Sequence, residues 1–154
     1  MLTALIDYES GNLHSALKAF EKISSENSLG SVTITNDPEI ISNADRLVLP
    51  GDGAFPACKA ALEKSEVFEA LKHAVLAKRR PFLGICVGMQ LMAKKGFEFE
   101  PTNGLNWING QVERIQLDDP SLKIPHMGWN EIAIDYDHVC LLYTSDAADD
   151  RMRV

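Results

Sequence analysis

Short apolar runs recur along the first part of the chain, and each is followed by a polar loop or a helical pattern. Four of these runs predict β-strands, at residues 1–6, 31–35, 46–49 and 82–86. The last run has no polar alternation, which is typical of a parallel strand buried on both faces.

Helical periodicity fills the segments between these strands. The first helix is predicted from the apolar face formed by Leu13, Ala16, Leu17, Phe20 and Ile23. Asp37 as N-cap and Pro38 as first helical residue start a short second helix. Residues 56–80 form two helices or one interrupted near Ser65, and a further helix is expected from residue 89 to its end at Gly96.

Strand followed by helix, four times over, is the pattern of a doubly wound α/β protein. We therefore expect a flavodoxin-like three-layer sandwich around a mostly parallel sheet. From Gly104 the pattern changes to expected strands at residues 111–116 and 131–134, separated by a polar turn at residues 118–120. Residues 140–154 continue neither pattern, which fits either a frayed C-terminus or a tail of different origin.

Charge, apolar stretches and cysteine spacing argue against several classes of protein. The chain has 154 residues and a formal net charge of -7, without a basic stripe, so nucleic acid is not an expected partner. It has neither an apolar stretch long enough for a membrane span nor a recognisable leader, and a cytoplasmic protein is expected. Its three cysteines have unrelated spacings, so we expect no disulfide framework, no metal and no cofactor.

The most informative segment is residues 84–90, where the fourth strand meets a helix. Cys86 stands between Gly84 and Gly88, and small residues at these two positions allow the sharp turn of a nucleophile elbow. The helix start favours a thiolate, and the N–H of Val87 is placed to stabilise an oxyanion. The alternative is a structural cysteine buried in an apolar strand.

A second glycine-rich loop, residues 50–55, follows the third strand. Loops that follow parallel strands gather at the carboxyl edge of the sheet, so this loop should face Cys86. Backbone N–H groups of Gly51, Asp52 or Gly53 would then complete an oxyanion hole. The alternative is an ordinary glycine turn.

With these motifs the chain resembles the class I (triad) glutamine amidotransferases, and within them the glutaminase subunit of imidazole glycerol phosphate synthase. Four blocks carry the resemblance, in order and spacing, at residues 6–13, 49–55, 84–90 and 125–130. It covers residues 1–138, taken as one domain that lacks its C-terminal elements, with a tail unrelated to the family at residues 139–154.

The resemblance implies a glutaminase in which Cys86 attacks the side-chain amide of glutamine, releases ammonia and forms a thioester that water hydrolyses. Glutamine would be held by Gln90 and by the loop at Gly51, Asp52 and Gly53. The ammonia would pass into a partner (β/α)8 cyclase subunit. The positions that match the family's subunit interface are Asn12, His126, Met127, Gly128, Trp129 and Asn130.

Three departures from the family pattern stand out. Glu9 occupies a position where a small residue, often glycine, is usual. Asp52 occupies one where valine is frequent, and we expect its carboxylate to point away from the oxyanion. The family's general base lies in a His-Pro-Glu segment, and no His here is followed by Pro-Glu. His138 has no orienting neighbour in the sequence. We therefore expect a poor glutaminase, or a non-catalytic fragment that keeps part of the docking surface.

Overall fold

The computed structural model describes residues 1–117, 124, 129–130 and 152–153. Its centre is a four-stranded sheet in the order β2-β1-β3-β4, with every neighbouring pair parallel. The strands are β1 (Leu2–Ile6), β2 (Ser31–Thr35), β3 (Arg46–Gly51) and β4 (Phe82–Cys86). All four predicted strands are thereby confirmed, although β3 runs two residues further than expected, through Gly51, and the strand order agrees with the expected flavodoxin-like fold.

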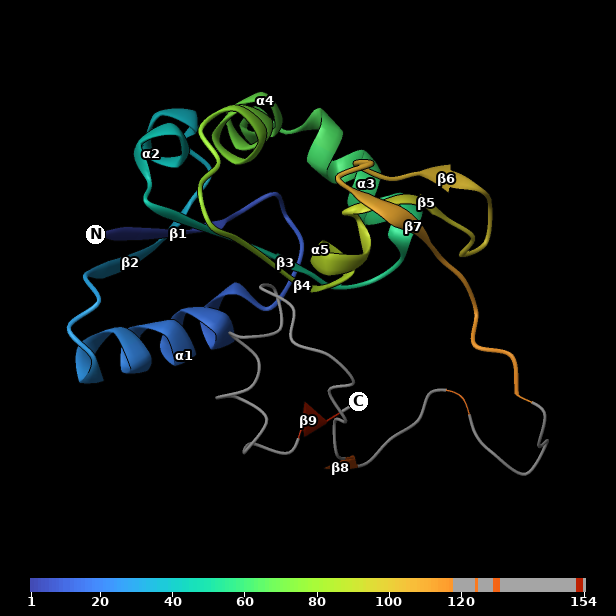
Figure 1. The fold of residues 1–154 in the computed structure, drawn as a ribbon, viewed down its shortest axis with the longest axis horizontal. Helices are drawn as coiled ribbons and strands as arrows, with labels where there is room; N and C mark the ends of the chain where they lie inside the picture. The colour runs from blue at the N-terminus through green and yellow to red at the C-terminus, as the bar shows by residue number, and fades with distance from the viewer. Residues whose placement is uncertain (118–123, 125–128, 131–151, 154) are drawn as a thin grey trace. The chain divides into compact units, whose positions relative to one another are not determined.

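Helices lie on both faces of this sheet (Figure 1). Helix α1 (Leu13–Glu26) covers one face, and α2 (Pro38–Asn43), α3 (Phe55–Lys64) and α4 (Val67–Lys72) cover the other. The predicted N-cap of α2 is confirmed, because the Asp37 carboxylate accepts a hydrogen bond from the N–H of Glu39 at 2.8 Å. A π-helical turn, η1 (His73–Ala77), continues α4.

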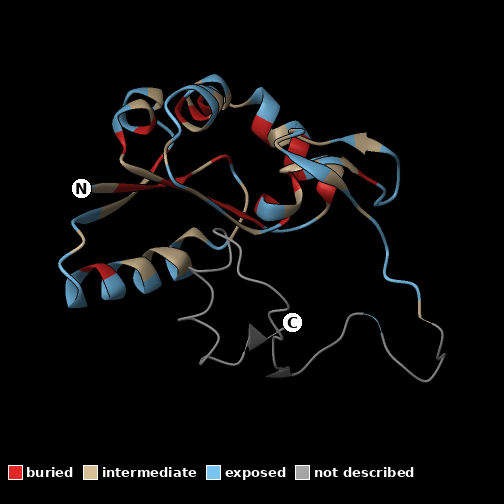
Figure 2. Ribbon diagram, viewed as in Figure 1, coloured by how far each residue is buried: buried red, intermediate tan, exposed pale blue. Residues whose placement is uncertain are grey.

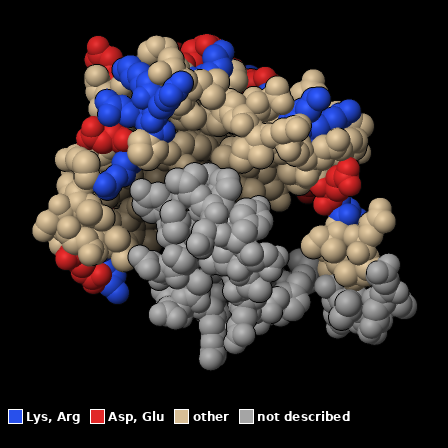
Figure 3. All heavy atoms as spheres, in the orientation of Figure 1, with Lys and Arg blue, Asp and Glu red and all other residues tan. Residues whose placement is uncertain are grey.

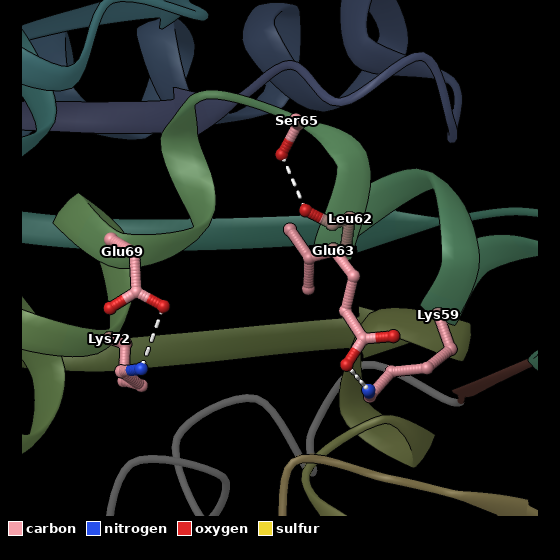
Figure 4. Close-up of polar contacts among 6 residues, drawn as sticks. All are labelled: Lys59, Leu62, Glu63, Ser65, Glu69 and Lys72. Carbon is pink, nitrogen blue, oxygen red and sulfur yellow. Dashed lines mark hydrogen bonds and ion pairs between the residues drawn. The ribbon is translucent and has the colours of Figure 1, made fainter.

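The expected break in the long helical segment occurs at Ser65. This residue ends α3, and its hydroxyl donates to the carbonyl of Leu62 at 2.6 Å (Figure 4). Lys59 forms an ion pair with Glu63 one turn along α3, although its own side chain is almost fully buried. The interruption lets α3 and α4 follow the sheet as two separate segments.

The core follows from the alternation of side chains along the strands. Ala4 and Ile6 of β1 and Leu47 and Leu49 of β3 point to the helices α2, α3 and α4 and are almost inaccessible to solvent. Leu5 and Val48 point to the opposite face and are equally buried. Buried residues therefore concentrate in the central strands and on the helix faces turned toward them (Figure 2).

The helix expected from residue 89 to Gly96 is wrong beyond its first turn. Helix α5 (Val87–Gln90) has four residues, and β5 (Ala93–Gly96) follows as a strand. The reason is tertiary: backbone carbonyls of residues 91–94 accept hydrogen bonds from N–H groups of residues 104–108 instead of from their own helix. Pairing with a later segment overrides the local helical pattern.

Strand β5 belongs to a second, three-stranded sheet in the order β6-β5-β7. It is completed by β6 (Thr102–Asn103) and β7 (Ile108–Val112), so the strand expected at residues 111–116 begins earlier and ends at residue 112. Residues 1–114 form one compact unit. In the second unit, β8 (Trp129–Asn130) pairs antiparallel with β9 (Met152–Arg153). The strand expected at residues 131–134 and the turn at residues 118–120 lie outside the described residues.

The surface carries both signs of charge. On the face drawn in Figure 3, Lys and Arg occur in separate groups with Asp and Glu nearby. Within the described part of the chain, no helix has the length and apolar character needed to cross a membrane.

Candidate active site at the carboxyl edge of the sheet

Cys86 ends β4 and is the residue immediately before α5. Its backbone has φ 53° and ψ -121°, a left-handed conformation that is rare for a residue with a side chain. Such strain concentrates at functional sites, and this conformation is the one that a nucleophile elbow requires. The residue is exposed and its thiol is free.

Three glycines make this turn sterically possible. A Cβ on Gly88 would lie 1.9 Å from the carbonyl oxygen of Leu49, and one on Gly84 would lie 2.6 Å from the Cα of Met89. On Gly51, which pairs with Cys86 in the β3–β4 register, a Cβ would lie 2.5 Å from the backbone nitrogen of Gly88. The backbones of β3, β4 and α5 are therefore in direct contact, which places the two glycine-rich loops side by side.

The loop after β3 is held by two side chains from other elements. Ser10 donates its hydroxyl to the carbonyl of Asp52 at 3.0 Å and accepts the N–H of Asp52 at 3.1 Å. Cys58 of α3 donates to the same carbonyl at 3.3 Å. The Asp52 peptide is thus engaged by Ser10 and Cys58, while the Asp52 side chain is exposed. Gly53 follows with φ +105°, a conformation that favours glycine.

The same loop leads into α3, whose N-terminus has no cap from the preceding residue, Ala54. The carboxylate of Glu98, from the segment between β5 and β6, accepts the backbone N–H of Phe55 at 2.7 Å. A carboxylate at this position satisfies an otherwise unpaired helix donor and favours the helix dipole. Glu98 therefore fixes the far end of the glycine-rich loop.

The loop between β1 and α1 completes the carboxyl edge of the four-stranded sheet. Glu9 has φ 67°, so the departure noted in the sequence falls on backbone that favours glycine. Asp7 compensates in part, because its carboxylate accepts the N–H of Glu9 at 3.1 Å. Gly11 packs on the β3 end: a Cβ there would lie 2.9 Å from the Cβ of Pro50. The loops after β1, β3 and β4 thus meet at one place.

The remaining predicted residues divide between the described and undescribed parts of the chain. Val87 is the first residue of α5, so its N–H has no carbonyl partner inside that helix. Gln90 is the last residue of the same turn. Asn12 is the N-cap of α1, where its side chain accepts the N–H of Ser15 at 3.2 Å.

Part of the expected partner interface lies outside the described residues, namely His126, Met127 and Gly128. Trp129 and Asn130 form strand β8 in the second unit. His138 also lies outside the described residues. Of the other histidines, His14 is exposed in the first turn of α1 and His73 begins η1.

Four residues with a clear place in this site were not singled out from the sequence: Tyr8, Ser10, Cys58 and Glu98. Their signal is weak because they come from three separate segments of the chain, and because none of them belongs to the two glycine motifs that mark the site. Cys58 looked like an ordinary helical cysteine. Only the packing of three loops at one sheet edge gives these side chains a role.

Comparison with known proteins agrees with this geometry. The family model for glutamine amidotransferase class-I matches residues 4–152. Imidazole glycerol phosphate synthase subunit HisH of Cereibacter sphaeroides is 54% identical over 142 residues, covering 92% of this chain and 67% of the relative. The subunit of the same name from Ruegeria pomeroyi is 57% identical over 139 residues, covering 90% and 66%. That from Caulobacter vibrioides is 48% identical over 146 residues, covering 94% and 68%. The chain spans about two thirds of the length of these relatives.

Proposed function

Because the chain belongs to the class-I glutamine amidotransferase family, we propose that it hydrolyses the side-chain amide of glutamine and supplies the ammonia for imidazole glycerol phosphate synthesis in histidine biosynthesis. The observation that carries this proposal is the strained backbone of Cys86, at a turn where the backbones of Gly51 and Gly88 are in close contact. A side chain larger than hydrogen at Gly51 or Gly88 would collide with backbone atoms, so the turn at Cys86 could not lie beside the second glycine-rich loop.

The proposed reaction begins when the Cys86 thiolate attacks the amide carbon of glutamine and forms a carbon–sulfur bond. The N–H of Val87 and N–H groups of the loop at Gly51 and Gly53 stabilise the oxyanion. The carbon–nitrogen bond then breaks, the nitrogen takes up a proton and leaves as ammonia, and a thioester remains. Water hydrolyses the thioester to glutamate and returns the thiol.

Binding of glutamine is assigned to the residues around this centre. In our proposal Gln90 and the loop at Gly51 and Asp52 hold the substrate. Each belongs to an element that ends or begins at the carboxyl edge: β3 for Gly51, the loop after it for Asp52 and α5 for Gln90. The exposed Asp52 side chain is compatible with a carboxylate that does not face the oxyanion.

The partner in this proposal is the (β/α)8 cyclase subunit, in a heterodimer, with docking through Asn12 and residues 126–130. The relatives' names describe a subunit of a synthase, which supports an assembly with a second subunit. We further propose a cytoplasmic location, since the free thiols of Cys58 and Cys86 are typical of a reducing compartment.

Turnover is tested by measuring glutamate release from glutamine in the presence of a cognate cyclase subunit. The comparison is between this chain and a version extended by the C-terminal third of the Ruegeria relative. We expect clear turnover from the extended version, abolished by Cys86→Ala, and much slower turnover from this chain. A positioned base contributes about 10² to 10⁴ in rate, and no His-Pro-Glu segment is present here.

Two results would contradict the proposal: no turnover by the extended version, or turnover that survives Cys86→Ala. Equal turnover by both versions would show that this chain already contains a base, with His138 as the first candidate. Docking is tested separately by a pull-down with the cyclase subunit. Trp129→Ala and Asn12→Ala should each weaken capture, and unchanged capture in both would exclude this interface.

A further inference from the structure

Tyr8 is a polar residue of the core that the proposed reaction does not use. It follows β1, is 2% exposed, and its hydroxyl oxygen has no hydrogen-bond partner among the described residues. A buried hydroxyl without a partner is unfavourable for folding, whereas phenylalanine would fill nearly the same space without that cost. A hydroxyl at this position therefore points to a task other than stability.

The location of the hydroxyl indicates what this task is. A Cβ added to Gly51 would lie 2.9 Å from the Tyr8 hydroxyl oxygen. It would also lie 2.5 Å from the Gly88 nitrogen and 3.0 Å from the Val87 carbonyl carbon. The hydroxyl thus lies in the junction between the end of β3 and the first turn of α5. It reaches the elbow from the inside of the molecule, while Cys86 is exposed on the outside.

Tyr8 keeps its proton under all ordinary conditions. Burial raises the pKa of Tyr8 to about 12; interaction with the Ser10 hydroxyl lowers the pKa in part, and the thiols of Cys58 and Cys86 raise it further. These are the titratable groups that act on Tyr8, from α3 and from the end of β4. The Asp52 side chain is exposed, and the Glu98 carboxylate is bonded to the start of α3. Tyr8 is therefore a neutral hydroxyl group that lies beside Ser10 and Cys58 without a well-formed hydrogen bond to either.

The nucleophile needs such a group. A thiolate is favoured by donors and positive ends of dipoles, and α5 is only one turn long, so its macrodipole is small. The Asp52 N–H is already donated to Ser10. A hydroxyl dipole that is free to turn, held in a low-dielectric junction beside the elbow, interacts strongly with any charge that develops there.

We propose that Tyr8 is a positioning residue for Cys86: its buried hydroxyl turns its proton toward the elbow when the thiolate forms and stabilises that charge from inside the fold. The inference rests on the proposed function only in taking Cys86 as the nucleophile. It gives the loop after β1 a second role at the elbow, beside that of Ser10 in holding the Asp52 peptide.

The test is the pH dependence of Cys86 alkylation by iodoacetamide, followed by mass spectrometry of the peptide that contains it. In Tyr8→Phe the midpoint of the rate-against-pH curve should rise, and the rate at pH 7 should fall about threefold to tenfold. The urea midpoint should stay the same or increase. Phe82→Leu is the matched control. It loosens the first residue of β4, the strand that ends at Cys86, where Phe82 packs edge-on against Trp107.

An unchanged alkylation midpoint in Tyr8→Phe, or an equal shift in Phe82→Leu, would overturn the proposal. Incorporation of 3-fluorotyrosine at position 8 gives an independent test that leaves the packing nearly intact. Its more acidic hydroxyl is a stronger donor, so the midpoint should fall, and an unchanged midpoint would again refute the role. Alkylation needs no glutamine. A failure of glutaminase turnover would therefore refute the proposed function, and the alkylation midpoints would still test the role of Tyr8.

Discussion

The elbow and the loop beside it achieve their shapes by different means. At the elbow, the backbones of β3, β4 and α5 touch at Gly51, Gly84 and Gly88, and no Cβ fits between them. The loop at Asp52 and Gly53 is instead held by side chains, through Ser10, Cys58 and Glu98, and has open space around Gly53. The position of Cys86 is therefore fixed by steric exclusion, whereas the loop after β3 is fixed by a few replaceable hydrogen bonds.

This difference predicts unequal sensitivity to mutation, and the largest effect belongs to the elbow. Gly88→Ala forces a Cβ to within 1.9 Å of the Leu49 carbonyl oxygen, so β3 and α5 must separate. We expect a loss of about 3 kcal/mol or more in the free energy of unfolding, measured by urea denaturation. Gly110→Ala is the matched control, since nothing lies within 4 Å of its Cβ position. A loss below about 1 kcal/mol for Gly88→Ala would contradict steric exclusion.

The next effect is at the anchored end of the loop. Glu98→Ala removes the acceptor of the Phe55 N–H at the start of α3, and we expect a loss of about 1 to 2 kcal/mol in unfolding free energy. Glu98→Gln keeps an oxygen acceptor and should lose less. If the two variants were equally destabilised, the loss would come from charge and not from the hydrogen bond.

A smaller effect is expected at the other anchor. Ser10→Ala removes both hydrogen bonds to the Asp52 peptide and should cost about 1 kcal/mol in unfolding free energy. Amide exchange measured by mass spectrometry should accelerate in the peptide containing residues 52–58. Ser25→Ala, which removes an exposed hydroxyl bonded to the carbonyl of Lys22, should change neither quantity. Exchange equal to that of the unmodified chain would show that Ser10 does not hold the loop.

At neutral pH the smallest effect belongs to Tyr8, because its shifted pKa makes stability depend on pH only under alkaline conditions. Its pKa is about 12 in the folded chain against 10.0 for an unperturbed tyrosine, so only the unfolded state loses this proton between these values. The contribution to stability is complete below pH 10 and is lost as the pH rises toward 12. The free energy of unfolding, measured by urea denaturation at several alkaline pH values, should therefore fall less steeply with pH in Tyr8→Phe than in the unmodified chain. Parallel declines would exclude a raised Tyr8 pKa.

The same contrast explains what the sequence could predict. The four central strands and the Ser65 break are local patterns, with apolar runs and helix caps that identify themselves within a few residues. The elbow was predictable because its glycines stand two residues on either side of Cys86. Both features depend on neighbours in the sequence.

What the sequence did not predict depends on distant neighbours. Strand β5 has a helical pattern, but its backbone carbonyls pair with residues 104–108. The side chains that hold the loop after β3 come from Ser10, Cys58 and Glu98, which are at least 40 residues apart along the chain. Nothing in a local pattern of hydrophobic and polar positions records such contacts.

The most direct test of the account is to treat the chain with a glutamine analogue carrying a diazoketone and to locate the adduct by mass spectrometry. Cys86 stands exposed on a strained turn, whereas Cys58 is buried and donates to the Asp52 carbonyl. We expect one adduct, on Cys86, formed more slowly when glutamine is present and absent in Cys86→Ala. Labelling of Cys58 first, or labelling of Cys86 that glutamine does not slow, would contradict it.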